Sequence, residues 1–175
     1  ADKNGYAQGA FNVNAVCQVK AAVDVHQILR SPAIIQGADL ANGFMGGRTD
    51  FANSTLEDKK AGAKNIGAAV KKYAADSDIP VALHLDHGKN FDSCIAAIEG
   101  GYTSVMIDGS SLPFDENVEL TREVVKYAHE RGVTVEGELG VLAGVEDHVF
   151  AATSTYTNPL SAIDFFKKTG VDALA

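Results

Sequence analysis

Short, strongly apolar runs alternate along the chain with longer segments in which apolar residues recur at helical spacing. Continuous apolar runs of this kind predict strands that are buried on both faces, as in a parallel sheet covered by helices. We predict strands over Gly9–Asn14, Ala33–Gln36, Val81–Gly88, Ser104–Gly109 and Val133–Gly140, with a sixth beginning in Val171–Ala175. The intervening pattern predicts helices over Ala15–Arg30, Thr55–Ala75, Phe91–Glu99, Glu116–Arg131 and Pro159–Thr169.

Local signals mark the helix starts and the loops. Asn14 is a suitable cap for the first helix, and the stretch beginning at Thr55 resembles a capping box. Residues Gly37–Ser54 and Val141–Asn158 are predicted as loops, and a loop as long as the first is usually functional or mobile. The lysines of the second helix are predicted to form a solvated face; they are Lys59, Lys60, Lys64, Lys71 and Lys72.

Polar residues gather where successive predicted strands end: Asn12 and Asn14, Asp86 and His87, Asp108, and Glu138. In a (β/α)8 TIM barrel this carboxyl-end rim is where active sites are built. A flavodoxin-like doubly wound sheet shows the same strand–helix alternation, but it concentrates its site at one switch point. The chain is therefore predicted to be an α/β protein, a single (β/α) barrel domain over residues 1–175. Five strands and the start of a sixth fall short of the eight that close a barrel, so we expect a barrel truncated at its C-terminus.

Charge and cysteine content narrow the class of function. The 175 residues carry 15 Lys and Arg against 23 Asp and Glu, for a net charge of −8, which argues against a nucleic-acid surface. No stretch is apolar enough or long enough to cross a membrane, and no signal peptide opens the chain. Cys17 and Cys94 are widely separated and lie in apolar helical patterns, which predicts two buried structural thiols and a reducing, cytoplasmic setting.

The third predicted strand, Val81–Gly88, ends in Asp86, His87 and Gly88. A carboxylate beside an imidazole at the end of a buried strand is costly unless the two bind something. The alternative is that Asp86 caps the next helix while His87 is solvated. His84 alternates with Asp86 along this strand, and we expect it to support the site or pack in the barrel interior rather than bind a metal.

Several motifs in this order, taken together, resemble class II fructose-1,6-bisphosphate aldolase. They are Gly9–Asn14, His84–Gly88, Val105–Ser110, Val135–Gly140 and Thr169–Ala175, so the resemblance spans essentially the whole chain. It implies a (β/α)8 barrel that cleaves fructose 1,6-bisphosphate reversibly to dihydroxyacetone phosphate and glyceraldehyde 3-phosphate with a zinc ion. Tagatose-1,6-bisphosphate aldolase shares the motif set and is the alternative. A non-catalytic sugar-phosphate-binding fragment is the alternative of another class.

The resemblance also implies roles for individual residues. His87 is expected to bind zinc, and Glu138 to be a carboxylate beside the metal that can hold an alternative metal position. Asp86 is implied as the proton donor and acceptor at the C4 hydroxyl, and Glu146 as the acid that moves the C3 proton of dihydroxyacetone phosphate. The substrate-binding residues implied are Asn12, near a phosphate, and Asp108, at the rim.

The same resemblance sets expectations outside the chain. Two further zinc-binding histidines are expected beyond Ala175, together with later phosphate-binding loops. A monovalent cation, a sugar bisphosphate as the small-molecule partner, and a homodimer or homotetramer are also implied. Ala38 stands where many relatives have Ser, so one phosphate contact is expected to be missing or supplied by backbone. No lysine lies at a strand end where a Schiff base would form, which favours metal chemistry.

Overall fold

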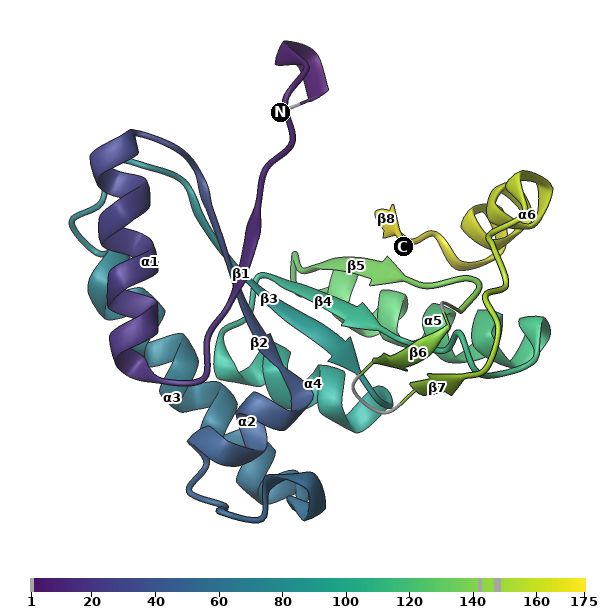
Figure 1. The fold of residues 1–175 in the computed structure, drawn as a ribbon, viewed down its shortest axis with the longest axis horizontal. Helices are drawn as coiled ribbons and strands as arrows, with labels where there is room; N and C mark the ends of the chain where they lie inside the picture. The colour runs from purple at the N-terminus through teal and green to yellow at the C-terminus, as the bar shows by residue number, and fades with distance from the viewer. Residues whose placement is uncertain (1, 142, 147–148) are drawn as a thin grey trace.

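A computed structural model describes residues 2–141, 143–146 and 149–175. Six parallel strands form one sheet in the order β1-β2-β3-β4-β5-β8, so each strand pairs with the next one of the sheet along the chain. The strands are β1 (Ala10–Asn12), β2 (Ala33–Ala38), β3 (Val81–Gly88), β4 (Ser104–Ile107), β5 (Thr134–Gly137) and β8 (Ala173–Leu174). Figure 1 shows this sheet with α1 near one end and α6 near the other.

The helices that connect these strands are α1 (Val16–Leu29), α3 (Leu56–Ala74), α4 (Phe91–Gly100), α5 (Phe114–His129) and α6 (Pro159–Thr169). A short helix α2 (Asp39–Met45) and 3₁₀ turns η1 (Asp2–Asn4) and η2 (Phe51–Asn53) complete the helical elements of the described residues. Strand order that follows chain order is the arrangement of a (β/α)8 barrel, whereas a doubly wound sheet reverses direction at a switch point. The barrel prediction is therefore confirmed over these six strands, and the doubly wound alternative is wrong.

The hydrophobic core lies between the sheet and the helices. In β2 the burial alternates, with Ala33 and Ile35 facing the helices and Gln36 facing the other side. Strand residues such as Leu85 and Val105 are fully buried against helix residues, among them Val19, Ile66, Cys94, Val124 and Phe165. Because side chains alternate along a strand, the same pattern sends every second residue into the barrel interior.

The loop predicted over Gly37–Ser54 is wrong in large part, because β2 extends to Ala38 and α2 and η2 follow. Helix α2 packs very closely on α3. A Cβ added at Gly62 of α3 would lie 1.7 Å from the backbone oxygen of Asn42 of α2. Asp39 is 1% exposed and forms an ion pair with Lys59, Nζ to Oδ2, at 2.5 Å. Lys59 was predicted on a solvated face; only 14% of its side chain is exposed, so that prediction is wrong for Lys59.

Of the two predicted helix caps, one is confirmed and one is wrong. The capping box of Thr55 and Asp58 is confirmed at the start of α3. Asn14 does not cap α1, because the N-cap residue is Ala15 and the backbone N–H of Asn14 donates to the side chain of Gln18.

Two further predictions fail in part. The prediction that both cysteines are buried holds for Cys94 and fails for Cys17, which is exposed on α1. The predicted loop after β5 contains an antiparallel hairpin of β6 (Gly144–Glu146) and β7 (Val149–Ala151), so tertiary pairing adds structure that apolar periodicity did not indicate.

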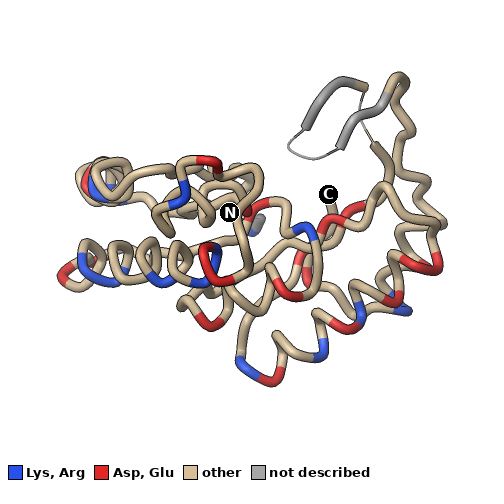
Figure 2. Tube along the Cα trace, turned by 90° about the horizontal axis from the view of Figure 1, so that it is seen from below, with Lys and Arg blue, Asp and Glu red and all other residues tan. Residues whose placement is uncertain are grey.

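Charged side chains are dispersed over the outer surface. Figure 2 shows residues of both charge signs spread over the helices, and in α3 the acidic residues lie in the first turn while lysines follow along the rest of the helix. No helix in the described part of the chain has the length and apolar character needed to cross a bilayer.

Candidate active site

An irregularity at the end of β3 creates the site. Leu85 pairs with Val105 of β4, but Gly88 pairs with Ile107, so three steps along β3 match two steps along β4. His87 adopts a left-handed backbone with φ of 49°, which is unusual for a residue other than glycine. Neighbouring residues of a regular strand point to opposite faces, whereas this bulge lets Asp86 and His87 both line one cavity.

Gly88 completes the bulge because no side chain fits there. An added Cβ would lie 2.5 Å from the backbone oxygen of Met106 and 2.9 Å from Cys94 Sγ. Such contacts are far closer than normal packing allows, so β3 can approach β4 at this point only with glycine. The sequence motif Asp86-His87-Gly88 therefore combines two functional groups with the backbone geometry that presents them together.

His87 lies among carboxylates from the next two strands. Its Nδ1 is 2.9 Å from Oδ2 of Asp108, which follows β4, and 3.8 Å from Oε2 of Glu138, which follows β5. One ligand atom from each of these three residues lies within 4.8 Å of the others. The hydrogen bond with Asp108 raises the pKa of His87 to about 9, against the opposing effect of burial. An imidazole beside carboxylates offers donors that suit a divalent cation such as zinc, and a carboxylate that is hydrogen-bonded to the imidazole can orient it.

Both carboxylate oxygens of Asp108 accept or share hydrogen bonds with neighbouring residues. Its Oδ1 accepts hydrogen bonds from the backbone N–H and hydroxyl of Ser110, at 3.0 and 2.6 Å. Burial would raise the pKa of Asp108, but the hydrogen bonds from His87 and Ser110 hold it below its ordinary value. Asn117 on α5 supports the neighbouring segment by donating to the backbone oxygen of Glu138 at 2.8 Å. The acidic cluster is thus fixed by residues around it and is not a set of loose surface groups.

Asp86 makes its contacts on the side of β3 away from β4, towards β2 and β1. Its Oδ2 accepts a hydrogen bond from Asn12 Nδ2 of β1 at 2.7 Å, and Asp86 is paired in register with Ala38 of β2. The alternative in which Asp86 caps the next helix is wrong, because Asn90 caps α4 through Ser93. His87 is likewise not solvated, since only 15% of its side chain is exposed.

His84 and Glu136 lie deeper in the barrel. His84 Nδ1 is 2.8 Å from Ser104 Oγ, and its Nε2 is 3.4 Å from Glu136 Oε2. Burial lowers the pKa of His84, so the neutral imidazole is favoured, whereas burial raises the pKa of Glu136. The expectation that His84 supports the site or packs in the interior agrees with these contacts.

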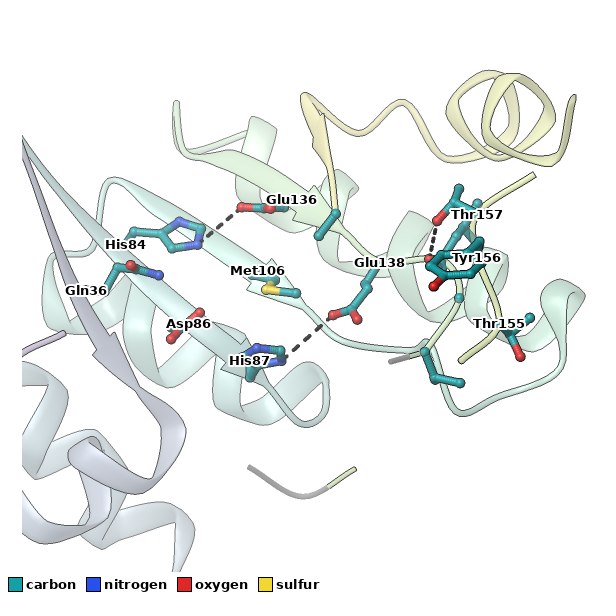
Figure 3. A pocket seen from close by; sticks show the side chains of 14 residues that line it. Gln36, His84, Asp86, His87, Met106, Glu136, Glu138, Thr155, Tyr156 and Thr157 are labelled. Carbon is teal, nitrogen blue, oxygen red and sulfur yellow. Dashed lines mark hydrogen bonds and ion pairs between the residues drawn. The ribbon is translucent and has the colours of Figure 1, made fainter. Parts of the chain in front are cut away.

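A cavity of about 340 Å³ lies at the carboxyl ends of these strands, and several of the side chains described above line it (Figure 3). Asp86, His87, Glu136 and Glu138 all line it, and Tyr156 and Thr157 from the segment after β7 close one side. The site residues predicted from sequence that the structure brings together are Asn12, Asp86, His87, Asp108 and Glu138. Glu146 lies in β6, and its side chain is outside the described residues.

Glu136 is a cavity residue to which the sequence analysis gave no role. A sequence signal was present, because Glu138 comes two residues after Glu136, just as Asp86 comes two residues after His84. Period-two spacing places both members of such a pair on the same face of a strand. The sequence did not show whether that face was the barrel interior.

Comparison with known proteins gives a consistent result. A family model described as class-II fructose-bisphosphate aldolase matches residues 1–175. The fructose-bisphosphate aldolase of Treponema pallidum is 49% identical over 177 residues, covering 99% of this chain and 49% of the relative. That of Geobacillus stearothermophilus is 41% identical over 172 residues, covering 97% of this chain and 55% of the relative. The chain therefore spans about half the length of the curated relatives it matches.

Solved structures agree on the fold. The YdjI aldolase from Escherichia coli K12 superposes with a TM-score of 0.74 at 29% identity, covering 98% of this chain and 54% of that one. A Coccidioides immitis protein superposes with a TM-score of 0.79 at 25% identity, covering 98% of this chain and 55% of that one. The six-stranded sheet thus corresponds to roughly half of these aldolase barrels.

Proposed function

This chain belongs to the class II fructose-bisphosphate aldolase family, and on that premise we propose that the natural protein containing it cleaves fructose 1,6-bisphosphate reversibly. The products are dihydroxyacetone phosphate and glyceraldehyde 3-phosphate. The observation that carries the proposal is the convergence of Asp86, His87, Asp108 and Glu138 at the carboxyl ends of three adjacent strands. An active site at this rim is what the barrel architecture favours.

The donor set fits zinc, the metal on which class II aldolases generally depend. We assign His87 and Glu138 as the residues of this chain that hold the ion. Asp108 orients the imidazole through Nδ1, as carboxylates commonly do for metal-binding histidines, so we assign Nε2 of His87 to the metal. The further ligands are proposed to come from histidines elsewhere in the natural protein. When bound, zinc supplies Lewis-acid stabilisation for the negative charge that carbon–carbon cleavage leaves on the ketone half of the substrate.

Asp86 is proposed as the general base for cleavage. It takes the proton of the C4 hydroxyl as the C3–C4 bond breaks, so that C4 becomes the aldehyde carbon of glyceraldehyde 3-phosphate. The hydrogen bond from Asn12 fixes one carboxylate oxygen, which leaves Asp86 a restricted range of orientations. In the direction of synthesis, Asp86 returns the proton to the new hydroxyl group.

Glu146 is proposed to complete the proton balance. The electron pair released from the C3–C4 bond resides on the dihydroxyacetone phosphate half, and protonation at C3 by Glu146 gives the product. The hairpin of β6 and β7 that carries Glu146 follows β5 directly, in the segment next to the cavity wall. Asn12 and Asp108 are also proposed to approach the bound substrate, in addition to their contacts with Asp86 and His87.

Further features of the natural protein are proposed from the resemblance to the family. We propose a cytoplasmic homodimer or homotetramer that binds a sugar bisphosphate and neither nucleic acid nor membrane, with a monovalent cation as a second ion. The net charge of −8 supports the absence of a nucleic-acid surface. Size-exclusion chromatography with light scattering tests the oligomeric state.

The experiment that tests this function is a zinc-dependent cleavage assay on the natural protein, with tagatose 1,6-bisphosphate tested in parallel. Chelation should abolish cleavage and added zinc should restore it. Asp86→Ala should lower kcat by about 10²–10⁴-fold while zinc content is retained, and His87→Ala should lose zinc. Asp115→Ala, an exposed carboxylate on α5, is the matched control. Cleavage that persists without metal contradicts the proposal, and binding of sugar phosphates without turnover would indicate the non-catalytic alternative.

A further inference from the structure

The interior of the barrel below the catalytic rim is polar. In register across adjacent strands, Gln36 of β2 lies beside His84 of β3, and His84 lies beside Ser104 of β4. Glu136 of β5 is one interior level higher, beside Met106. Barrel interiors are commonly filled by bulky branched apolar side chains. Burying a polar group costs free energy unless the group is hydrogen-bonded, so polar side chains at this depth need either hydrogen-bond partners in the protein or a ligand.

These side chains form a continuous chain of contacts across three strands. Ser104 Oγ is 2.8 Å from His84 Nδ1, and His84 Nε2 is 3.4 Å from Glu136 Oε2. His84 is well enclosed, with 10% of its side chain exposed, whereas 29% of the Glu136 side chain is exposed. The exposed end of the chain is therefore the carboxylate, and His84 and Ser104 restrict its orientation from behind.

The Glu136 carboxylate faces the reaction space. It lines the same cavity as Asp86 and His87, and Figure 3 shows it above Asp86 with His84 at its side. His84, Asp86 and Glu136 thus share one cavity wall. Nothing in the mechanism above uses Glu136, although it lies within the pocket that holds the proposed base.

We propose that Glu136, positioned by His84 and Ser104, binds substrate by accepting a hydrogen bond from the C5 hydroxyl of the open-chain ketose bisphosphate. This inference rests on the proposed function. A carboxylate needs a donor, and it repels the phosphates at C1 and C6. The oxygens at C2 and C3 belong to the half that becomes dihydroxyacetone phosphate, and the C4 hydroxyl is assigned to Asp86. The C5 hydroxyl is the remaining donor, and it is adjacent to C4.

The test compares fructose 1,6-bisphosphate with its 5-deoxy analogue in steady-state cleavage by the zinc-loaded natural protein. Glu136→Leu should lower kcat/KM for the natural substrate by about 10–100-fold, the usual effect of losing a hydrogen bond to a charged group. The same variant should change kcat/KM for the 5-deoxy analogue by less than about threefold. Glu136→Gln keeps an acceptor oxygen and should recover part of the loss.

Ser104→Ala serves as a milder variant if Glu136→Leu does not fold. It removes the far end of the contact chain and should reduce discrimination between the two substrates by about two- to fivefold. Asp115→Ala, at the exposed α5 position already used as a control, is the matched control here and should leave discrimination unchanged. Zinc content and thermal unfolding are measured for every variant.

The outcomes separate the inference from the proposed function. Selective loss on the hydroxylated substrate supports the assignment of Glu136. Equal loss on both substrates indicates a structural role and overturns it, as does an unchanged kcat/KM in Glu136→Leu. If the unchanged protein cleaves neither substrate, the proposed function fails and the inference fails with it.

Discussion

Replacing Lys59 with methionine should destabilise the protein strongly, although Lys59 lies outside the site. Lys59 pairs with Asp39 at 2.5 Å, and Asp39 is 1% exposed. Methionine keeps most of the length of the side chain but removes its charge, which leaves the Asp39 carboxylate buried without its cation. Breaking a buried ion pair in this way typically costs about 3–5 kcal/mol. The expected loss is in this range because both side chains are largely withdrawn from solvent.

The assay is urea unfolding of the natural protein followed by circular dichroism, with thermal unfolding as a second measurement. Lys59→Met should lower the unfolding free energy by about 3–5 kcal/mol and the Tm by roughly 5–10 °C. The double variant Asp39→Asn with Lys59→Met should be less destabilised than Lys59→Met alone, because no unpaired charge remains buried. Lys64→Met, at an exposed position of the same helix, should cost less than about 0.5 kcal/mol.

One result would refute this reasoning. If Lys59→Met were no more destabilising than Lys64→Met, the carboxylate of Asp39 could not be dependent on Lys59 for its burial. The close packing of α2 on α3 through Gly62 would then suffice to hold the helix beside β2. A loss of several kcal/mol confined to Lys59→Met would instead show that the ion pair anchors α2.

Three further predictions concern the site and the thiols. Asp108→Asn should weaken zinc binding by about 10–100-fold, because it alters the hydrogen-bond partner of His87 Nδ1. Competition with a chromophoric chelator measures the zinc affinity. Unchanged affinity would count against Asp108 as the group that orients His87. In the metal-free protein the pKa of His87 is raised to about 9, so its contribution to stability is complete below about pH 6.5 and is lost as the pH rises through 9. We expect a fall of at most about 3 kcal/mol over that range, with a flatter profile in Asp108→Asn; a pH-independent Tm in metal-free protein would contradict this. Cys17 should react readily with maleimide in the native state while Cys94 reacts only after unfolding, since Cys94 is fully buried and burial raises the pKa of its thiol; mass spectrometry of the labelled peptides distinguishes the two sites.

Much of the architecture follows from local patterns. The strands β3 to β5 lie within the apolar runs that predicted them, and β2 covers its predicted run and continues two residues beyond it, to Ala38. A continuous apolar run is stable only when both of its faces are covered. Helix ends were predictable where a single residue caps the helix. Thr55 caps the start of α3, and Gly170 ends α6 in the left-handed conformation. The strand-end residues Asp86 and Asp108 were identifiable because parallel strands bring their carboxyl ends to one rim.

The burial of Lys59 and of the two cysteines, and the hairpin of β6 and β7, could not be predicted from local sequence. Whether Lys59 is solvated depends on the position of Asp39, which lies 20 residues earlier and reaches it only through the packing of α2 on α3. Cys17 and Cys94 both lie in apolar helical patterns, yet the neighbouring elements cover one and not the other. The hairpin of β6 and β7 arises from pairing between short segments whose own sequence has no strong strand pattern.

By itself, the sequence determined the strand–helix alternation, the strands whose ends carry chemical groups, and the identities of those groups, since each depends on neighbours along the chain. Only the tertiary structure decided that β3 bulges, so that Asp86 and His87 share a cavity when adjacent strand residues normally point apart. It also decided that His87 meets Asp108 and that His84 meets Glu136. These contacts join residues on different strands, and their geometry is set by the register and curvature of the sheet.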